Sequence, residues 1–370
     1  MEKQEILAWL KKKDENSLDE LWRWADCVRR ENVGDEVHLR GLIEISNYCV
    51  RQCGYCGLRF GNWSVERYRM TEHEIMARVW EAERYGYGTV VLQAGEDYGI
   101  RTDWLAGIIR RIKAETQLAV TLSLGERPEG DLEAWRGAGA DRYLLRFETS
   151  DQDLYRLIHP PLPGRPSDRL ATLRTLGTLG YETGGGVMIG IPGQTYSSLA
   201  NDVGLFRALD LDMIGVGPYI PHPATPVGTG AWTRIIPKVE QVPNTEEMTY
   251  KVIALARIVC PEANVPATTA LAAINAATGR ELGLMRGANV VMPNLTPPQY
   301  RARYEIYPPK AQVSGTAASS HSHVCRRIRA IGRDIGRGRG DRVRRAGNPH
   351  FSSGLAVLQS GAKAVKWPRV

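Results

Sequence analysis

The chain has 370 residues, of which 43% are hydrophobic and 24% are charged, and its formal net charge is +7. This is the composition of a soluble globular protein, and no apolar run is long enough to cross a bilayer. The N-terminus has no apolar segment of secretory length, so the sequence predicts a cytoplasmic protein with no membrane partner.

Residues 1–40 are predicted to form a helical lead-in. Ser17 can cap a helix whose apolar residues recur at helical spacing, with Glu20 at the capping-box position.

Residues 41–310 alternate between short apolar or β-branched runs and helix-length segments that begin at Thr or Ser. Strand–helix repeats predict a parallel sheet in an α/β protein. Eight repeats over about 250 residues match a closed (β/α)8 TIM barrel better than an open doubly wound sheet. The eight predicted strands are Leu42–Ser46, Thr89–Gln93, Leu118–Leu122, Arg142–Arg146, Gly186–Ile189, Met213–Val216, Asn264–Thr268 and Ala288–Met292.

Residues 311–370 hold the excess positive charge, with 12 Lys and Arg against 2 Asp and Glu, which leaves 36 against 39 in residues 1–310. The composition from about Gln312 to Phe351 is rich in Ser, Ala, Gly and Arg and predicts a basic, poorly ordered tail. An arginine-rich run could contact phosphates, but a solvated terminus is the simpler interpretation, and a nucleic-acid partner is not expected.

Polar residues follow the ends of several predicted strands. Chemistry in a (β/α)8 barrel lies where strands end and the next loops begin. The residues in such places include Cys49, Gly95, Glu96, Thr121, Arg146, Glu148, Thr268 and Thr269. Their convergence predicts one site on that rim.

Three cysteines, Cys49, Cys53 and Cys56, lie in the loop after the first predicted strand. They supply one ligand fewer than a structural zinc site, and no further Cys or His stands at zinc-finger spacing. An iron–sulfur cubane on three cysteines leaves one iron open to bind substrate. We therefore expect these residues to be metal ligands, with zinc or scattered buried thiols as the alternative.

The Cys-x3-Cys-x2-Cys motif, with the aromatic Tyr55 before its last cysteine, resembles that of the radical S-adenosylmethionine (radical SAM) superfamily. The resemblance implies an oxygen-sensitive enzyme with a 4Fe–4S cluster. The cluster would chelate the amino and carboxylate groups of S-adenosylmethionine and cleave this cofactor to a 5′-deoxyadenosyl radical.

The resemblance also implies contacts to S-adenosylmethionine. Gly95 and Glu96 stand where the superfamily has a Gly-Gly-Glu-like element that holds the methionine ammonium, although Ala94 replaces the first glycine. A strand-end Arg146–Glu148 pair is equally often a structural ion pair. The implied cofactor contacts are Tyr55, Gly95, Glu96, Thr121, Glu148 and Arg169, with Glu148 at the ribose and Arg169 at the carboxylate.

Further segments between about residues 40 and 308, such as Val91–Asp97 and Gly190–Thr195, resemble the HydE family of FeFe-hydrogenase maturases. Biotin synthase and methylornithine synthase are relatives. The family assignment implies a role in assembling the two-iron subcluster of the hydrogenase. The radical would act on an iron-bound cysteine complex carrying carbon monoxide and cyanide, which a tyrosine-cleaving maturase supplies.

The same resemblance implies a substrate cavity beneath the cofactor. Tyr300, Tyr304 and Tyr307 have helical spacing, however, and an ordinary packing stripe is the alternative interpretation for them. The implied substrate contacts are Thr268, Thr269, Met292 and Tyr304, and the implied catalytic residues are Arg146, Tyr304 and Tyr307.

The expected partners are a small organometallic or amino-acid-derived substrate, an electron donor such as a ferredoxin or flavodoxin, and other hydrogenase maturases. Some HydE proteins carry three more cysteines near the C-terminus for a second cluster, whereas only Cys325 stands there in this chain, so we expect one cluster. Two other functions stay open: a methylornithine-synthase-like or other radical mutase acting on a small amino acid, and a non-catalytic iron–sulfur carrier or scaffold.

Overall fold

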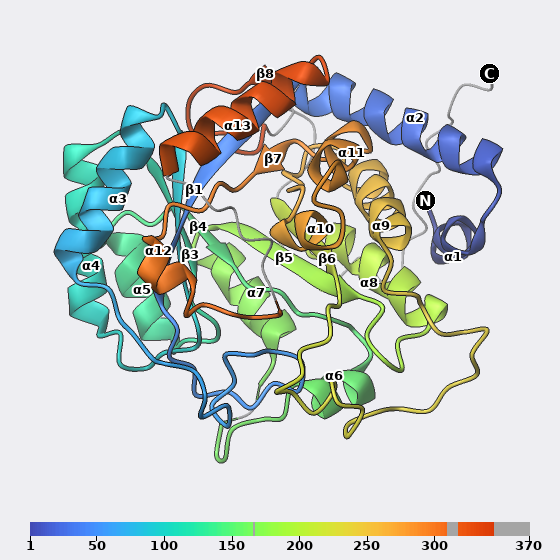
Figure 1. The fold of residues 1–370 in the computed structure, drawn as a ribbon, viewed down its shortest axis with the longest axis horizontal. Helices are drawn as coiled ribbons and strands as arrows, with labels where there is room; N and C mark the ends of the chain where they lie inside the picture. Colours follow the sequence, from blue (N-terminus) through green and yellow to red (C-terminus); the bar gives the residue numbers. More distant parts are fainter. Residues whose placement is uncertain (166, 309–316, 344–370) are drawn as a thin grey trace.

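The computed structural model describes residues 1–165, 167–308 and 317–343. At its centre, parallel strands curl into a barrel with helices on the outside (Figure 1). The strands are hydrogen-bonded in the order β6-β5-β4-β3-β2-β1-β7, and β8 also pairs with β1. Their bounds are β1 Glu36–Ser46, β2 Thr89–Ala94, β3 Ala119–Ser123, β4 Arg142–Leu144, β5 Glu182–Ile189, β6 Met213–Pro218, β7 Val290–Val291 and β8 Asp334–Ile335.

Residues 264–266 complete the ring between β6 and β7. Asn264 bridges Met213 of β6, and Pro266 bridges Val290 of β7, both in parallel. The predicted (β/α) barrel is confirmed, but one wall is thin: the seventh predicted strand is reduced to isolated bridges, and β7 has only two residues.

The helices cover the outside of the barrel, and α1 and α2 add the predicted N-terminal extension by packing on α8 and α9. Asp14, rather than Ser17, caps α2, because its carboxylate accepts a hydrogen bond from the Ser17 amide (2.9 Å). No helix in the described part of the chain has the length and apolarity to span a membrane. The bounds are α1 Lys3–Lys11, α2 Glu15–Val33, α3 Glu72–Arg84, α4 Thr102–Glu115, α5 Glu129–Gly137, α6 Gln152–Ile158, α7 Arg169–Thr178, α8 Tyr196–Ala208, α9 Glu246–Val259, α10 Thr269–Ile274, α11 Gly279–Met285, α12 Pro298–Arg301 and α13 Ala317–Ala330.

Residues 317–343 are ordered, so the predicted poorly ordered tail is wrong for this stretch, while 309–316 and 344–370 lie outside the described residues. Helix α13 buries Val324, Cys325 and Ile328, which share one helical face. Strand β8 then pairs with the beginning of β1. Figure 1 shows both elements at the end of the barrel opposite the loops that follow the strands.

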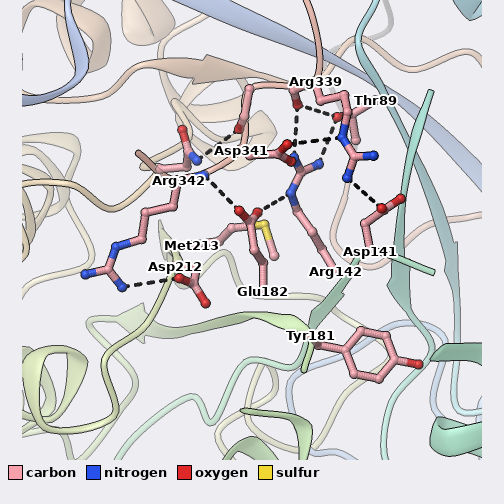
Figure 2. A network of polar contacts seen from close by, with 12 residues as sticks. Thr89, Asp141, Arg142, Tyr181, Glu182, Asp212, Met213, Arg339, Asp341 and Arg342 are labelled. Atoms are coloured by element: carbon pink, nitrogen blue, oxygen red, sulfur yellow. Dashed lines mark hydrogen bonds and ion pairs between the residues drawn. The ribbon is translucent and has the colours of Figure 1, made fainter. Parts of the chain in front are cut away.

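The segment after β8 closes the floor of the barrel, where the strands begin (Figure 2). The fully buried Arg142 guanidinium donates to Glu182, to the Thr89 hydroxyl (2.9 Å) and to Asp341 of the C-terminal segment. Arg342 pairs with Asp212 (3.2 Å) and Asp210. The arginines of the tail are therefore neutralised by acidic residues at the starts of distant strands.

Replacing Arg142 by alanine is expected to lower the free energy of unfolding by about 2–4 kcal/mol. The change leaves the Glu182 carboxylate without its buried cation, and the cost is limited because Asp341 is 47% exposed. Urea denaturation measures this loss. The matched control is Arg339→Ala, which removes a 41% exposed partner of Asp141 and should cost less than about 1 kcal/mol. Equal losses in the two variants would show that the floor network adds no stability beyond a surface ion pair.

Candidate active site

Cys49, Cys53 and Cys56 lie together in the loop between β1 and α3, and none of them is in a disulfide. Burial, with a smaller contribution from the neighbouring Cys49 thiol, raises the pKa of the Cys56 thiol to about 12. Among the described residues, no three His, Cys, Asp or Glu side chains converge closely enough to hold a single metal ion. A cubane places each thiolate on a different iron and does not require such convergence.

Arg67 holds the backbone of this loop in place by hydrogen bonds. Its guanidinium donates to the carbonyl oxygens of Asn47 (2.6 Å), Leu58 (2.9 Å) and Arg59 (2.9 Å). The positive charge of Arg67 also lowers the pKa of Cys49 and of Cys56, against the larger opposing effect of burial. The arginine thus favours thiolates at two of the three predicted ligands.

Glycines let neighbouring chain segments approach the cysteines closely. A Cβ on Gly95 would stand 2.8 Å from the Cys49 Cβ and closer still to the Tyr48 carbonyl oxygen. A Cβ on Gly57 would stand 2.6 Å from His222 Nε2. Because real Cβ atoms do not approach other atoms so closely, the predicted cofactor contact Gly95 also shapes the cysteine loop.

Glu96 is 3% exposed, and its carboxylate is shared between three loops. It accepts hydrogen bonds from Arg51 Nε (2.7 Å), from the Tyr98 hydroxyl (2.9 Å) and from the Glu126 amide (3.0 Å). Arg51 lies between Cys49 and Cys53, so the acid after β2 is tied directly to the cysteine loop. The structure places Glu96 where the sequence predicts it and adds Arg51 as its cation.

Arg169, at the first turn of α7, continues this network. It donates to Glu126 (3.1 Å) and to the Arg146 carbonyl oxygen (2.7 Å), and it lies 2.7 Å from His159 Nε2. Burial and the Arg169 charge lower the pKa of His159 to about 2, so the ring is neutral and accepts at Nε2. Arg169 therefore joins the loops after β3, β4 and α6.

Sequence reasoning missed Arg51, Glu126 and His159. Arg51 could have been predicted from the sequence, because it stands between Cys49 and Cys53 and therefore lies beside the predicted cluster site. His159 follows a short helix, and its Nδ1 has no hydrogen-bond partner in the described part of the chain.

Several buried polar atoms at the barrel mouth have no hydrogen-bond partner among the described residues. Glu148 has φ +64°, and its Oε2 lies 3.0 Å from Arg146 Nη2 as an ion pair without hydrogen-bond geometry. An unsatisfied buried polar atom costs about 1–3 kcal/mol, so a set of them is typical of a ligand-binding site. The atoms are Thr121 Oγ1, Arg146 Nε, Glu148 Oε2, Tyr219 Oη and Thr268 Oγ1. All but Tyr219 were predicted.

The three tyrosines near residue 300 do not form one packing stripe, because α12 ends at Arg301. Tyr300 stacks on Tyr68 at 4.5 Å between ring centroids and donates to Glu74. Tyr304 is 2% exposed, and its hydroxyl accepts from Gln93 of β2 (3.2 Å). Burial raises the pKa of Tyr307 to about 12, so its phenol is a neutral hydrogen-bond donor.

The remaining predicted substrate contacts lie on two further segments of the barrel. Thr268 and Thr269 begin α10, directly after the bridging segment 264–266. Met292 follows β7 and is half-buried.

Comparison with known proteins agrees with this geometry. Residues 43–206 match the family model of the radical SAM superfamily. The chain is 44% identical over 334 residues to the FeFe hydrogenase maturase subunit HydE of Thermotoga maritima, covering 90% of this chain and 91% of that protein. It is 28% identical over 289 residues to the 3-methylornithine synthase of Methanosarcina acetivorans, covering 78% of this chain and 77% of that protein.

Solved structures share the fold. The crystal structure of methylornithine synthase (PylB) superposes with a TM-score of 0.76 at 24% identity, over 91% of this chain and 94% of that chain. The FeFe-hydrogenase maturase HydG from Carboxydothermus hydrogenoformans superposes with a TM-score of 0.70 at 17% identity, over 90% of this chain and 75% of that chain. Because a relative is 44% identical over nine-tenths of the chain, and the three cysteines stand in the loop after β1, the chain belongs to the radical SAM enzymes, in the family of the FeFe-hydrogenase maturase HydE.

Proposed function

We propose that this enzyme assembles the two-iron subcluster of an FeFe-hydrogenase, acting on an iron-bound cysteine complex that carries carbon monoxide and cyanide. The observation that carries the proposal is the 44% identity to HydE, against 28% to methylornithine synthase over a similar length. The same three cysteines and barrel would serve either reaction, so the residues lining the cavity decide between them.

The residues at the barrel mouth fit the two cofactors that the family implies. The three thiols of the cysteine loop supply ligands for one 4Fe–4S cluster. Buried polar atoms that have no hydrogen-bond partner among the described residues, such as Thr121 Oγ1 and Glu148 Oε2, supply polar contacts for S-adenosylmethionine. Tyr55, Gly95, Glu96 and Arg169 are the other proposed contacts. When bound, the reduced cluster and S-adenosylmethionine supply a 5′-deoxyadenosyl radical.

Around these contacts, buried charged side chains hold the loops of the proposed cofactor site in place. The Glu96–Arg51–Glu126–Arg169 network fixes the relative places of the cysteine loop and the loops after β2 and β3. Its carboxylates and guanidinium groups are nearly all buried, so their electrostatic attraction is little screened by solvent.

The substrate is proposed to lie between Arg146, Thr268, Thr269, Met292, Tyr304 and Tyr307. The Arg146 side chain is 32% exposed, and its Nε has no hydrogen-bond partner in the described residues. A guanidinium with a free N–H suits the carboxylate of an amino-acid-derived ligand. The neutral Tyr307 phenol adds a donor.

The proposed partners are a ferredoxin or flavodoxin as electron donor and the other maturases that make and receive the complex. We also propose that the protein is cytoplasmic and carries a single cluster.

Replacing Arg146 by methionine is expected to lower hydrogenase maturation at least about tenfold, because one charge-assisted hydrogen bond to the substrate is lost. The assay measures hydrogen evolution by an apo-hydrogenase incubated with the complete maturation system. The matched control is Arg156→Met, which removes a 69% exposed arginine of α6 and should leave maturation unchanged.

Two outcomes would contradict the proposal. Methylornithine formed from lysine and S-adenosylmethionine would favour the mutase. If reduced, cluster-loaded protein never yields 5′-deoxyadenosine, the carrier or scaffold alternative would stand instead.

A further inference from the structure

The cysteine loop presents two exposed aromatic side chains to solvent. Phe60 is 50% exposed and Trp63 is 82% exposed, and their rings meet edge to face with 5.5 Å between centroids. These two residues are called the Phe60–Trp63 pair below. Large aromatic side chains that stay in water forgo the gain of burial, and paired exposed aromatics are typical of protein-binding surfaces.

The pair is fixed to the predicted cluster ligands through the backbone. The Arg59 amide donates to the Cys56 carbonyl oxygen (3.1 Å), and the Phe60 amide donates to the Arg51 carbonyl oxygen (2.8 Å). Arg67 clamps the same turn through the Arg59 carbonyl oxygen. The aromatic pair is therefore tied to the cysteine loop by backbone hydrogen bonds, one of which joins Arg59 directly to Cys56.

The charge of this loop is positive. Residues 48–70 contain four arginines and one acid, a net charge of +3, although residues 1–310 as a whole are slightly acidic. Among the described residues, no carboxylate pairs with Arg59 or Arg67, whereas the acid, Glu66, is paired with Arg303 (2.9 Å). Arg67 donates instead to backbone carbonyl oxygens of the cysteine loop. A net positive charge beside an exposed aromatic pair favours a partner with an acidic face.

We propose that the Phe60–Trp63 pair, with Arg59 and Arg67 beside it, is the docking surface for the acidic one-electron carrier protein that reduces the cluster. This rests on the electron-donor part of the proposed function. Cys53 is 7% exposed, so an electron from an external donor must cross the protein that surrounds the thiols. The pair lies in the loop that carries all three thiols, and electrostatic attraction would bring an acidic carrier to it.

The test compares two reductants on the cluster-loaded enzyme, with 5′-deoxyadenosine formation as the readout. A reduced, acidic ferredoxin must dock, whereas dithionite needs no docking surface. In the double variant Phe60→Ala/Trp63→Ala, the ferredoxin-driven kcat/KM is expected to fall at least about tenfold, through a higher KM for ferredoxin. The dithionite-driven rate should stay within about twofold of the wild type, because neither side chain ligates the cluster.

A control variant and a change of ionic strength test whether the effect is specific to this surface and electrostatic. Trp80→Ala removes an exposed tryptophan of α3 on the barrel wall and should change neither rate. Raising the ionic strength from about 0.05 M to about 0.5 M should weaken the ferredoxin-driven reaction of the wild type and leave the dithionite-driven one nearly unchanged.

A ferredoxin-driven kcat/KM that is unchanged in the double variant, or that falls no more than the dithionite-driven rate, would overturn the proposal. Cofactor cleavage is measured here without the maturation substrate. The docking proposal can therefore fail while the maturase function stands. Conversely, a failed maturation assay would leave the result of the docking test unchanged.

Discussion

Replacing Cys53 by alanine is expected to abolish cluster binding and to lower 5′-deoxyadenosine formation more than about a hundredfold. Cys53 is the most buried of the three predicted ligands, at 7% exposure. Two thiolates cannot hold three corners of a cubane. Iron and sulfide content after anaerobic reconstitution, together with 5′-deoxyadenosine yield, measure the loss.

The matched control is Cys260→Ala, since Cys260 is also a buried thiol but lies at the C-terminal end of α9. This variant should keep its iron, its sulfide and its cofactor cleavage. If Cys53→Ala still cleaved S-adenosylmethionine at the wild-type rate, the assignment of the ligands would be wrong.

Replacing Gly95 by alanine is expected to have the second largest effect, although the residue carries no ligand atom. The new Cβ would stand 2.8 Å from the Cys49 Cβ and closer to the Tyr48 carbonyl oxygen, so the cysteine loop must shift. Such overpacking costs about 1–3 kcal/mol, and a loop moved by this contact cannot keep its thiols in place. We expect cluster occupancy to fall about tenfold at limiting iron.

Iron content and the thermal unfolding midpoint measure both consequences. The control is Gly107→Ala in α4, where a Cβ would meet nothing within 4 Å and where alanine favours the helix by up to about 1 kcal/mol. Normal iron content in Gly95→Ala would mean that the close approach of the segment after β2 to the cysteine loop is not needed for the cluster.

The barrel was predictable because its signal is local. Buried parallel strands give short apolar runs, and six of the eight predicted strands overlap β1 to β6 in the structure. The wall between β6 and β7 was predicted less well. There the bridges of Asn264 and Pro266 involve single residues, and such short pairing leaves no repeating pattern in the sequence.

The C-terminal segment was not predictable from composition. Its arginines resemble a solvated tail because their partners lie far away in the sequence: Arg339 pairs with Asp141, and Arg342 pairs with Asp212. Charge complementarity across 130 or more residues becomes visible only once the barrel floor brings the strand starts together.

In the candidate site, too, features encoded by nearby residues were predictable and those that depend on distant residues were not. The spacing of the three cysteines predicts the metal ligands, whereas the partners of Glu96 and Arg169 depend on loops that the barrel brings together. Arg51 is 45 residues before Glu96, and Glu126 is 43 residues before Arg169.

The most direct test of the maturase function is an omission experiment. Apo-hydrogenase is incubated with the other maturases, S-adenosylmethionine and reductant, with or without this protein carrying its cluster, and hydrogen evolution is measured. We predict hydrogenase activity only in the complete mixture, and none when Cys53→Ala replaces the wild type. Equal activity in the mixture without this protein would contradict the account.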